Sequence, residues 1–265
     1  MDRVPGPHPA QAAQPGLGRH GLCAGCRHFP VLLDAGRCEP GDACVRAHSG
    51  RQIDRFLRNN RQEAAYYLAD LFWERRAIAA RYAPDDLLEP LVQDTDEVVR
   101  RVVATRLPVA ALGRLLRDPD REVRITVAQR LPERELVRLA GDADYRVRMV
   151  VADRLPHGKL LAMTGDAERE VRKIVARRLP AFALDALAGD PEPEVRRIVA
   201  ERALPVLAAA LLRDPDWWVR HAAVGCAPAE AVAALVDDPE PEVRIAVRRR
   251  LLESVKNRNR SGESP

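Results

Sequence analysis

The sequence lacks a long apolar run, a secretory signal and a strong excess of charge of one sign. The longest apolar run, from Ala203 to Leu212, is ten residues long and contains Pro205, so it is too short to span a bilayer. The first twenty residues contain no apolar stretch. No secretory signal is therefore visible, and we expect a cytoplasmic protein with no membrane association. The 43 basic and 39 acidic residues give a formal charge of +4, which is too small to argue for nucleic acid by itself.

Aromatic residues and lysine are also scarce. Only 4% of the 265 residues are aromatic, and 40 of the 43 basic residues are arginine, a bias that the positions of these residues must explain. Apolar residues still make up 46% of the chain, so it can bury a core, and its length corresponds to about two domains.

The composition changes along the chain. The first segment holds four prolines without periodicity, which predicts a poorly ordered tail, and the next holds four of the five cysteines. Six of the eleven aromatic residues lie between residues 53 and 82, which predicts a joint between the cysteine module and the segment after it, around Phe72 and Trp73. We divide the chain into a disordered tail (1–20), a cysteine module (21–48), linking helices (49–69), eight repeats (70–252) and a frayed tail (253–265).

An internal repeat of 24 residues dominates the sequence. An aspartate opens each copy, and an arginine follows it six residues later. Valine precedes that arginine in every copy but the first, and four copies close with Arg-Leu-Pro. Eight copies in register cannot arise by chance. The aspartates are Asp70, Asp94, Asp118, Asp142, Asp166, Asp190, Asp214 and Asp238, and the arginines are Arg76, Arg100, Arg124, Arg148, Arg172, Arg196, Arg220 and Arg244.

Each copy predicts two short helices. Valine at the fifth position after the aspartate, aliphatic residues at the eighth and ninth, and leucine at the thirteenth mark one buried helical stripe. Proline at the fourteenth position ends this helix, because it removes a donor and disfavours helix in the residue before it. A second apolar edge, with a spacing of three, predicts a short α-helix or 3₁₀ helix. Since no copy can bury its stripe alone, we expect an all-α solenoid that is stabilised by stacking.

Four of the cysteines predict a metal site. A reducing compartment argues against disulfides, and the pair in Cys-x-x-Cys can bind one metal centre from a tight turn that Gly25 helps to form. Four thiolates suit either tetrahedral zinc or an iron–sulfur cluster, and the spacing alone leaves both open. The candidate ligands are Cys23, Cys26, Cys38 and Cys44.

Other cysteine and histidine residues are interpreted without a metal. His20, His28 and His48 flank the four cysteines, and we interpret each as a surface residue because four thiolates already complete the ligand set. Cys226 stands alone at a position where other copies carry arginine, and we interpret it as a filler thiol.

These motifs resemble those of the leucine-rich repeat variant proteins. The resemblance rests on D-P-x-x-E-V-R-x-x-V-A-x-R-L-P, is clearest in residues 118–132 and 190–202, and extends to the cysteine module. It implies a right-handed superhelix of alternating α and 3₁₀ helices, preceded by a small domain whose cysteines hold a [4Fe–4S] cluster. The departures from the pattern lie in the first, seventh and last copies, at Phe72, Trp73, Ala223, Val224, Cys226 and Arg248.

The eight arginines of the repeats allow two interpretations. Stacked by a superhelix, they form a stripe suited to a nucleic acid or another polyanion. Alternatively, each arginine pairs with the aspartate of its own or a neighbouring repeat, and the bidentate geometry holds adjacent units in register. Residues 94–251 contain 28 basic and 26 acidic residues. We favour the structural interpretation, because phosphate binding needs uncompensated charge.

Two tryptophans stand out, and no catalytic set does. Trp217 and Trp218 lie where most other copies carry Glu, Arg, Pro or Val. Local packing is the commoner reason for such residues, but we expect at least one to be partly exposed as a contact point. The repeats contain no Ser/His/Asp set, glycine-rich phosphate loop or H-E-x-x-H motif, and His157 and His221 are isolated. We therefore expect no enzymatic activity.

Two functions fit these observations. In the first, the iron–sulfur module is attached to a solenoid whose surface binds a protein partner, and the cluster transfers an electron or reports redox or iron state. In the second, the solenoid binds nucleic acid or another polyanion, and the four cysteines hold a structural zinc ion. The mild net charge and the resemblance favour the first.

Overall fold

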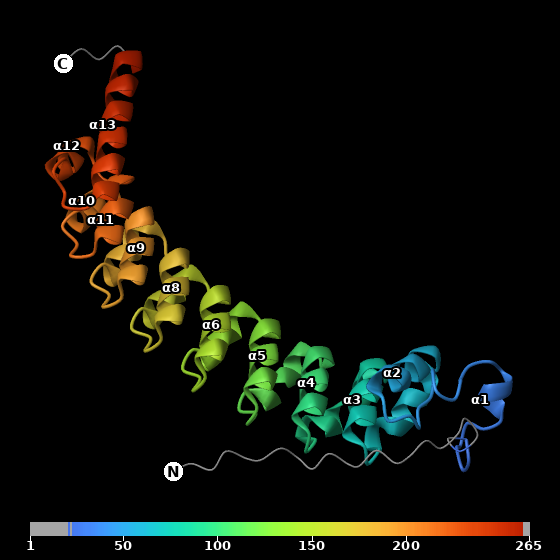
Figure 1. The fold of residues 1–265 in the computed structure, drawn as a ribbon. Coiled ribbons are helices and arrows are strands. Elements are labelled where there is room, and N and C mark those ends of the chain that lie inside the picture. Colours follow the sequence, from blue (N-terminus) through green and yellow to red (C-terminus); the bar gives the residue numbers. More distant parts are fainter. Residues whose placement is uncertain (1–20, 22, 262–265) are drawn as a thin grey trace, which may run out of the picture. The chain divides into compact units, whose positions relative to one another are not determined.

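The computed structural model describes residue 21 and residues 23–261, with side chains as far as Lys256. The predicted tail at residues 1–20 lies outside the described residues. The described chain is helical (Figure 1) and divides into two compact units, one ending at Leu115 and one beginning at Leu116. No strand forms within the described residues, where Glu39 and Ala43 make an isolated antiparallel bridge.

The N-terminal part contains one short helix before the longer ones begin. This is α1 (Val31–Asp34), and it is followed by α2 (Gly50–Asn59) and the 3₁₀ helix η1 (Arg61–Ala69). Ile53 and Leu57 of α2 and Ala64 of η1 are fully buried. These two helices therefore connect the cysteine module to the repeats.

One α-helix of each repeat begins three residues after the opening aspartate. In the first six repeats it is ten residues long, and in all but the first of these it ends at the arginine twelve residues after the aspartate, as the sequence predicts. In the first five repeats the residue after the helix has an extended backbone, which the following proline favours. These helices are α3 (Trp73–Tyr82), α4 (Glu97–Arg106), α5 (Arg121–Arg130), α6 (Tyr145–Arg154), α8 (Arg169–Arg178), α9 (Pro193–Arg202), α11 (Trp217–Val224) and α13 (Pro241–Ser261).

A second layer of shorter helices alternates with the first. Most are 3₁₀ helices, which suit the three-residue spacing of their apolar side chains. The predicted alternation of α and 3₁₀ helices is confirmed. The 3₁₀ helices are η2 (Asp85–Leu87), η3 (Glu89–Gln93), η4 (Val109–Leu115), η5 (Glu133–Leu139), η6 (Leu161–Met163), η7 (Ala181–Leu187) and η8 (Ala233–Leu235), and the short α-helices are α7 (His157–Leu160), α10 (Pro205–Leu211) and α12 (Ala229–Val232).

The predicted apolar stripe forms the core of each repeat. In α8, Val171, Val175 and the leucine that follows the helix, Leu179, are all 0% exposed. The equivalent Leu155 is 1% exposed. Each buried leucine contributes about 1.5–3 kcal/mol, so stacking of the repeats supplies most of the driving force for folding.

Acidic residues start many of these helices, but aspartate and glutamate behave differently. The side chains of Asp96, Asp120 and Asp144 accept a hydrogen bond from a backbone N–H in the first turn. Glu168 and Glu192 occupy the same position and make no such bond, because their side chains are one methylene longer than those favoured at an N-cap.

The last helix continues where the other repeats stop. Leu252 stands at the position where most copies carry proline, so nothing ends α13 there, and it runs on to Ser261. Residues 253–261 are therefore helical, in contrast to the frayed tail that the sequence predicted, and the remaining residues of that predicted tail, 262–265, lie outside the described residues. No helix among the described residues has the length and apolar character needed to cross a membrane.

Candidate functional site

The four candidate ligands line one cavity in the N-terminal unit. The cavity walls are otherwise mostly apolar, and they include Phe56 of α2. The backbone N–H of Cys26 donates to the oxygen of Cys23 at 3.0 Å, and Gly25 between them has a φ of +67°, a conformation that glycine favours. The predicted tight turn is therefore present. The thiols that meet at this cavity are those of Cys23, Cys26, Cys38 and Cys44.

The electrostatics of this cavity favour a cationic ligand. Burial raises the pKa of the Cys38 thiol, and the neighbouring cysteines raise it further. Burial also raises the pKa of Cys44. Thiolates crowded in an apolar cavity need positive charge to stabilise them, and iron is a suitable soft acceptor. The donor set of four thiols therefore fits an iron–sulfur cluster, whose ligands are cysteine thiolates.

His28 lies beside the cysteine cavity and is buried. Only 5% of it is exposed, and its Nε2 lies 2.7 Å from the hydroxyl of Tyr67 in η1. Burial lowers the pKa of His28, although Glu63, 3.7 Å from Nδ1, raises it in part. The interpretation of His28 as a surface residue is therefore wrong, because its partner lies 39 residues away and no local pattern reveals it. His48 is exposed, as predicted, and His20 lies outside the described residues.

Aromatic residues join the cysteine module to the linking helices, within the predicted range of residues 53–82 but nearer its start than Phe72 and Trp73. The ring of His28 lies 5.0 Å from that of Phe56, and the guanidinium of Arg27 lies 3.7 Å from the centre of the Tyr66 ring. Trp73 remains 38% exposed, and its aromatic neighbour is Phe72. The joint is therefore formed by α2 and η1, and not by Phe72 and Trp73.

The arginines that follow the opening aspartates by six residues, which we call the arginine ladder, bridge successive repeats. Nε and Nη2 of Arg172 donate to the two carboxylate oxygens of Asp190, at 2.7 and 3.0 Å. Nη1 of the same arginine donates to the backbone oxygen of Asp166 at 2.8 Å. This geometry confirms the structural interpretation. The same pairs join Arg76 to Asp94, Arg124 to Asp142, Arg148 to Asp166, Arg196 to Asp214 and Arg220 to Asp238.

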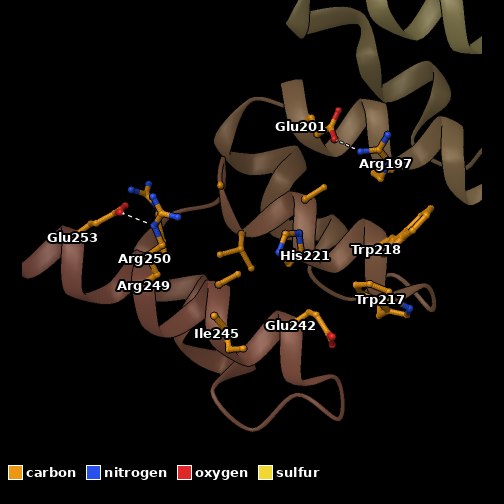
Figure 2. Close-up of a pocket in the computed structure, with 14 residues that line it drawn as sticks. Arg197, Glu201, Trp217, Trp218, His221, Glu242, Ile245, Arg249, Arg250 and Glu253 are labelled. Carbon is orange, nitrogen blue, oxygen red and sulfur yellow. Dashed lines mark hydrogen bonds and ion pairs between the residues drawn. The ribbon is translucent and has the colours of Figure 1, made fainter.

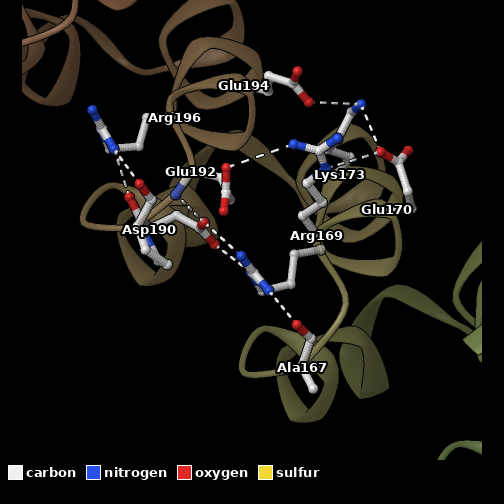
Figure 3. A network of polar contacts seen from close by, with 10 residues as sticks. Ala167, Arg169, Glu170, Lys173, Asp190, Glu192, Glu194 and Arg196 are labelled. Carbon is white, nitrogen blue, oxygen red and sulfur yellow. Dashed lines mark hydrogen bonds and ion pairs between the residues drawn. The ribbon is translucent and has the colours of Figure 1, made fainter.

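A second set of ion pairs lies outside this ladder. Figure 3 shows Lys173 between Glu170 and Glu194, with its Nζ 3.2 and 3.1 Å from their carboxylates. Arg169 lies 3.8 Å from Glu192 in the same view. These charges are compensated within the repeats, so this stretch offers no open stripe of positive charge.

The helix ends provide another contact between repeats. In several repeats the arginine that closes the helix donates to a backbone oxygen of the preceding repeat, as Arg106 does to Ala80 and Arg178 to Ala152, both at 2.8 Å. Cys226, which replaces this arginine in the seventh copy, lies with its Sγ 3.4 Å from the backbone oxygen of Glu201. Cys226 therefore occupies a structural position, as its interpretation as a filler thiol predicts.

The two tryptophans border a groove in the C-terminal unit (Figure 2). Trp218 is 50% exposed, which confirms that at least one is accessible, and its ring meets that of Trp217 edge-on at 5.7 Å. The groove has a volume of about 880 Å³ and lies over α9, α11 and α13. Ala222 and Ala246 are among the residues that line it.

Comparison with known proteins connects both parts of the chain to one class, that of helical solenoids headed by an iron–sulfur module. The family described as LRV protein FeS4 cluster matches residues 16–66, and the leucine rich repeat variant family matches residues 121–144 and 169–192. A solved structure described as a leucine-rich repeat variant with a novel repetitive protein structural motif is 56% identical. The similarity covers 86% of this chain and 98% of that one, with a TM-score of 0.82. The chain belongs to the leucine-rich repeat variant family.

A curated relative from Rhodobacter capsulatus gives a shorter match. It is described as an uncharacterized 27.7 kDa protein in nifB 3'region, and it is 40% identical over 88 residues. The match covers 33% of this chain and 36% of the relative's length. The prediction of an iron–sulfur cluster is confirmed by the family of the N-terminal module, and the zinc alternative is not supported.

Proposed function

We propose that the four cysteines ligate the cluster and that the cluster serves a redox or regulatory role through a protein partner of the repeats. The observation that carries this proposal is the meeting of Cys23, Cys26, Cys38 and Cys44 at one apolar cavity. When bound, a cluster of this kind supplies one-electron transfer, and its potential depends on burial and on hydrogen bonds to sulfur.

The surroundings of the cavity suit this role. Arg46 Nη1 donates to the backbone oxygen of Ala24 at 2.6 Å, which ties the first cysteine turn to the segment after Cys44. The backbone N–H of Cys44 donates to the backbone oxygen of Gln52 in α2 at 3.2 Å. The ligand loops are therefore held on helices that continue into the repeats, so loss or reduction of a cluster can alter the surface next to it.

The experiment is an anaerobic purification followed by a redox titration. We expect a brown protein with iron and sulfide bound, absorption near ~400 nm from sulfur-to-iron charge transfer, and bleaching that is reversed on reoxidation. A colourless protein with stoichiometric zinc contradicts the proposal. Iron without a reversible optical change contradicts the redox role and leaves a structural one.

The second function, binding of nucleic acid or another polyanion along the repeats, receives less support. The arginines that would contact phosphates are engaged by carboxylates, as in the pair of Arg196 and Asp214. Binding to duplex DNA at low salt, with a steep decline as salt rises, would favour this alternative. We expect no such binding along the ladder.

A further inference from the structure

The arginine ladder is closed at its first repeat and open at its last. Arg75 Nη1 lies 2.9 and 2.8 Å from the two carboxylate oxygens of Asp70, so this carboxylate already has a cation. At the other end, Arg244 Nη1 donates to the backbone oxygens of Asp238 and Pro239 at 2.6 and 2.9 Å. Among the described residues, no carboxylate accepts hydrogen bonds from Nε and Nη2 of Arg244. The sequence has glycine at position 262, where the period would place the next aspartate.

The preceding repeat shows what this open edge binds. Arg220 uses the same two nitrogens to hold Asp238, at 2.8 and 2.9 Å. Its Nη1 donates to the backbone of Asp214, just as Arg244 does to Asp238. The guanidinium of Arg244 is therefore anchored on one side and presents a planar fork that matches a carboxylate on the other.

Exposed aliphatic side chains share a face of α13 with this fork. Residues four, eight and eleven positions after Arg244 lie on nearly the same side of the helix, which places Arg248, Leu252 and Val255 beside it. Leu252 is 63% exposed and Val255 is 49% exposed. We call these four residues the end face. Figure 1 shows α13 as the last helix of the chain, extending beyond the short helices that precede it.

The end face is unsuited to another repeat of the same kind. The position of Arg248 is occupied in earlier copies by a small residue that is fully buried, such as Ala176 or Ala200. That small residue allows the next helix to pack closely, and an arginine in its place prevents the same packing. The partner of the end face therefore differs from a repeat of this chain.

The charge of α13 requires an acidic partner. Residues 241–261 contain seven basic and two acidic residues, a formal charge of +5, which exceeds the +4 of the whole chain. Two copies of α13 would repel each other. A head-to-tail contact would need the carboxylate of Asp70, which Arg75 already occupies.

We propose that the end face binds an acidic amphipathic helix of a partner protein, with one carboxylate in the fork of Arg244 and apolar side chains against Leu252 and Val255. This inference rests on the proposed function, because it names the class of partner that the repeats bind. Phosphates of a nucleic acid would suit the fork but would leave the aliphatic side chains without an apolar partner. An anionic membrane surface offers no fixed carboxylate.

The test uses a fluorescent synthetic peptide of about 20 residues, with leucine on one helical face and aspartate or glutamate on the other. A scrambled peptide of the same composition separates amphipathic recognition from charge alone. The protein variants are Arg244→Gln and Leu252→Ser. Their matched controls are Arg134→Gln, whose side chain is 84% exposed on η5, and Val137→Ser, which is 49% exposed on the same helix.

At about 0.15 M salt we expect the peptide to bind at least about tenfold more tightly than its scrambled form. Arg244→Gln and Leu252→Ser should each weaken binding by about tenfold, and the two controls by less than about twofold. Absence of binding, equal binding of the scrambled peptide, or equal losses in the controls would overturn the proposal. So would tighter binding of duplex DNA or of phosphatidylserine vesicles that Leu252→Ser leaves unchanged.

Failure of this inference can be distinguished from failure of the proposed function. The end face lies in the C-terminal unit, so Cys38→Ser should leave peptide affinity unchanged even if it removes the cluster. A chain that binds iron but not the peptide would contradict the end face alone, and one that binds the peptide but no iron would contradict the cluster role alone.

Discussion

At the scale of single residues, the ladder arginines combine three roles in one side chain. Arg172 and Asp190 are each 7% exposed, so their pair is screened from water and salt. Arginine is required because its fork reaches both carboxylate oxygens while Nη1 reaches a backbone oxygen of its own repeat. This role explains the arginine at the eight ladder positions better than a demand for positive charge does.

Replacing Arg172 with leucine should be strongly destabilising. The variant leaves the carboxylate of Asp190 buried without its cation, which typically costs about 3–5 kcal/mol. Arg177→Leu is the matched control, because Arg177 lies on the exposed side of the same helix, and its effect should stay within about 0.5 kcal/mol. Urea unfolding measures both, and similar losses in the two variants would contradict the structural role of the ladder.

The ladder also predicts how stability depends on pH. Burial alone would raise the pKa of Asp166, but hydrogen bonds from Arg148 and from the backbone N–H of Glu168 outweigh it, and the pKa is lowered. A pKa lowered in the folded state stabilises the fold above the unfolded value of about 3.9, and this contribution is lost as the pH falls through the folded pKa. Urea unfolding at several pH values should show this decline. Asp166→Asn should be less stable at neutral pH, and its stability should decline less steeply as the pH falls. If its pH profile equals that of the wild-type chain, Asp166 does not contribute to the pH dependence.

At the scale of helices, proline placement decides where most of the repeat α-helices end. Where proline follows leucine, as in Leu155-Pro156, the chain turns and the leucine is buried between the two layers. Where leucine replaces the proline, at Leu252, the helix continues. Leucine also replaces the proline at Leu204, but there Pro205 follows and α9 ends at Arg202, whereas no proline lies between Leu252 and Ser261.

Leu155→Ala should cost about 2–5 kcal/mol, because it removes a fully buried side chain and leaves a cavity in a packed interior. Denaturant unfolding of the variant tests this directly. A loss below about 0.5 kcal/mol, the size of an ordinary surface substitution, would mean that the stripe does not form the core.

Leu252→Pro should shorten α13. Proline would remove a helical hydrogen bond and disfavour helix at Leu251, so backbone amides after residue 254 should lose their protection from hydrogen exchange. Leu252→Ala keeps the helix and serves as the control. If the amides exchange at the same rate in both variants, the extension does not depend on the missing proline.

At the scale of the whole molecule, the parts that follow a period were predictable and the parts that depend on single distant contacts were not. The 24-residue spacing predicted the helices, their ends and the arginine pairs, because each signal is repeated. His28 was misjudged since its partner Tyr67 follows 39 residues later, with no period to connect them. The joint lies within the predicted range of residues 53–82, but its centre at Phe72 and Trp73 was wrong for the same reason, because Phe56 and Tyr66 make single contacts.

The central claim is that the cysteine module holds a cluster while the repeats fold on their own stacking. The decisive measurement compares iron content and far-UV circular dichroism in the wild-type chain, Cys38→Ser and Cys226→Ser, all purified anaerobically. Cys38→Ser should lose the cluster, because a hydroxyl is a harder and less readily deprotonated ligand, yet keep the helicity of the repeats. Cys226→Ser should keep both. Full iron content in Cys38→Ser, or a general loss of helicity in that variant, would contradict this account.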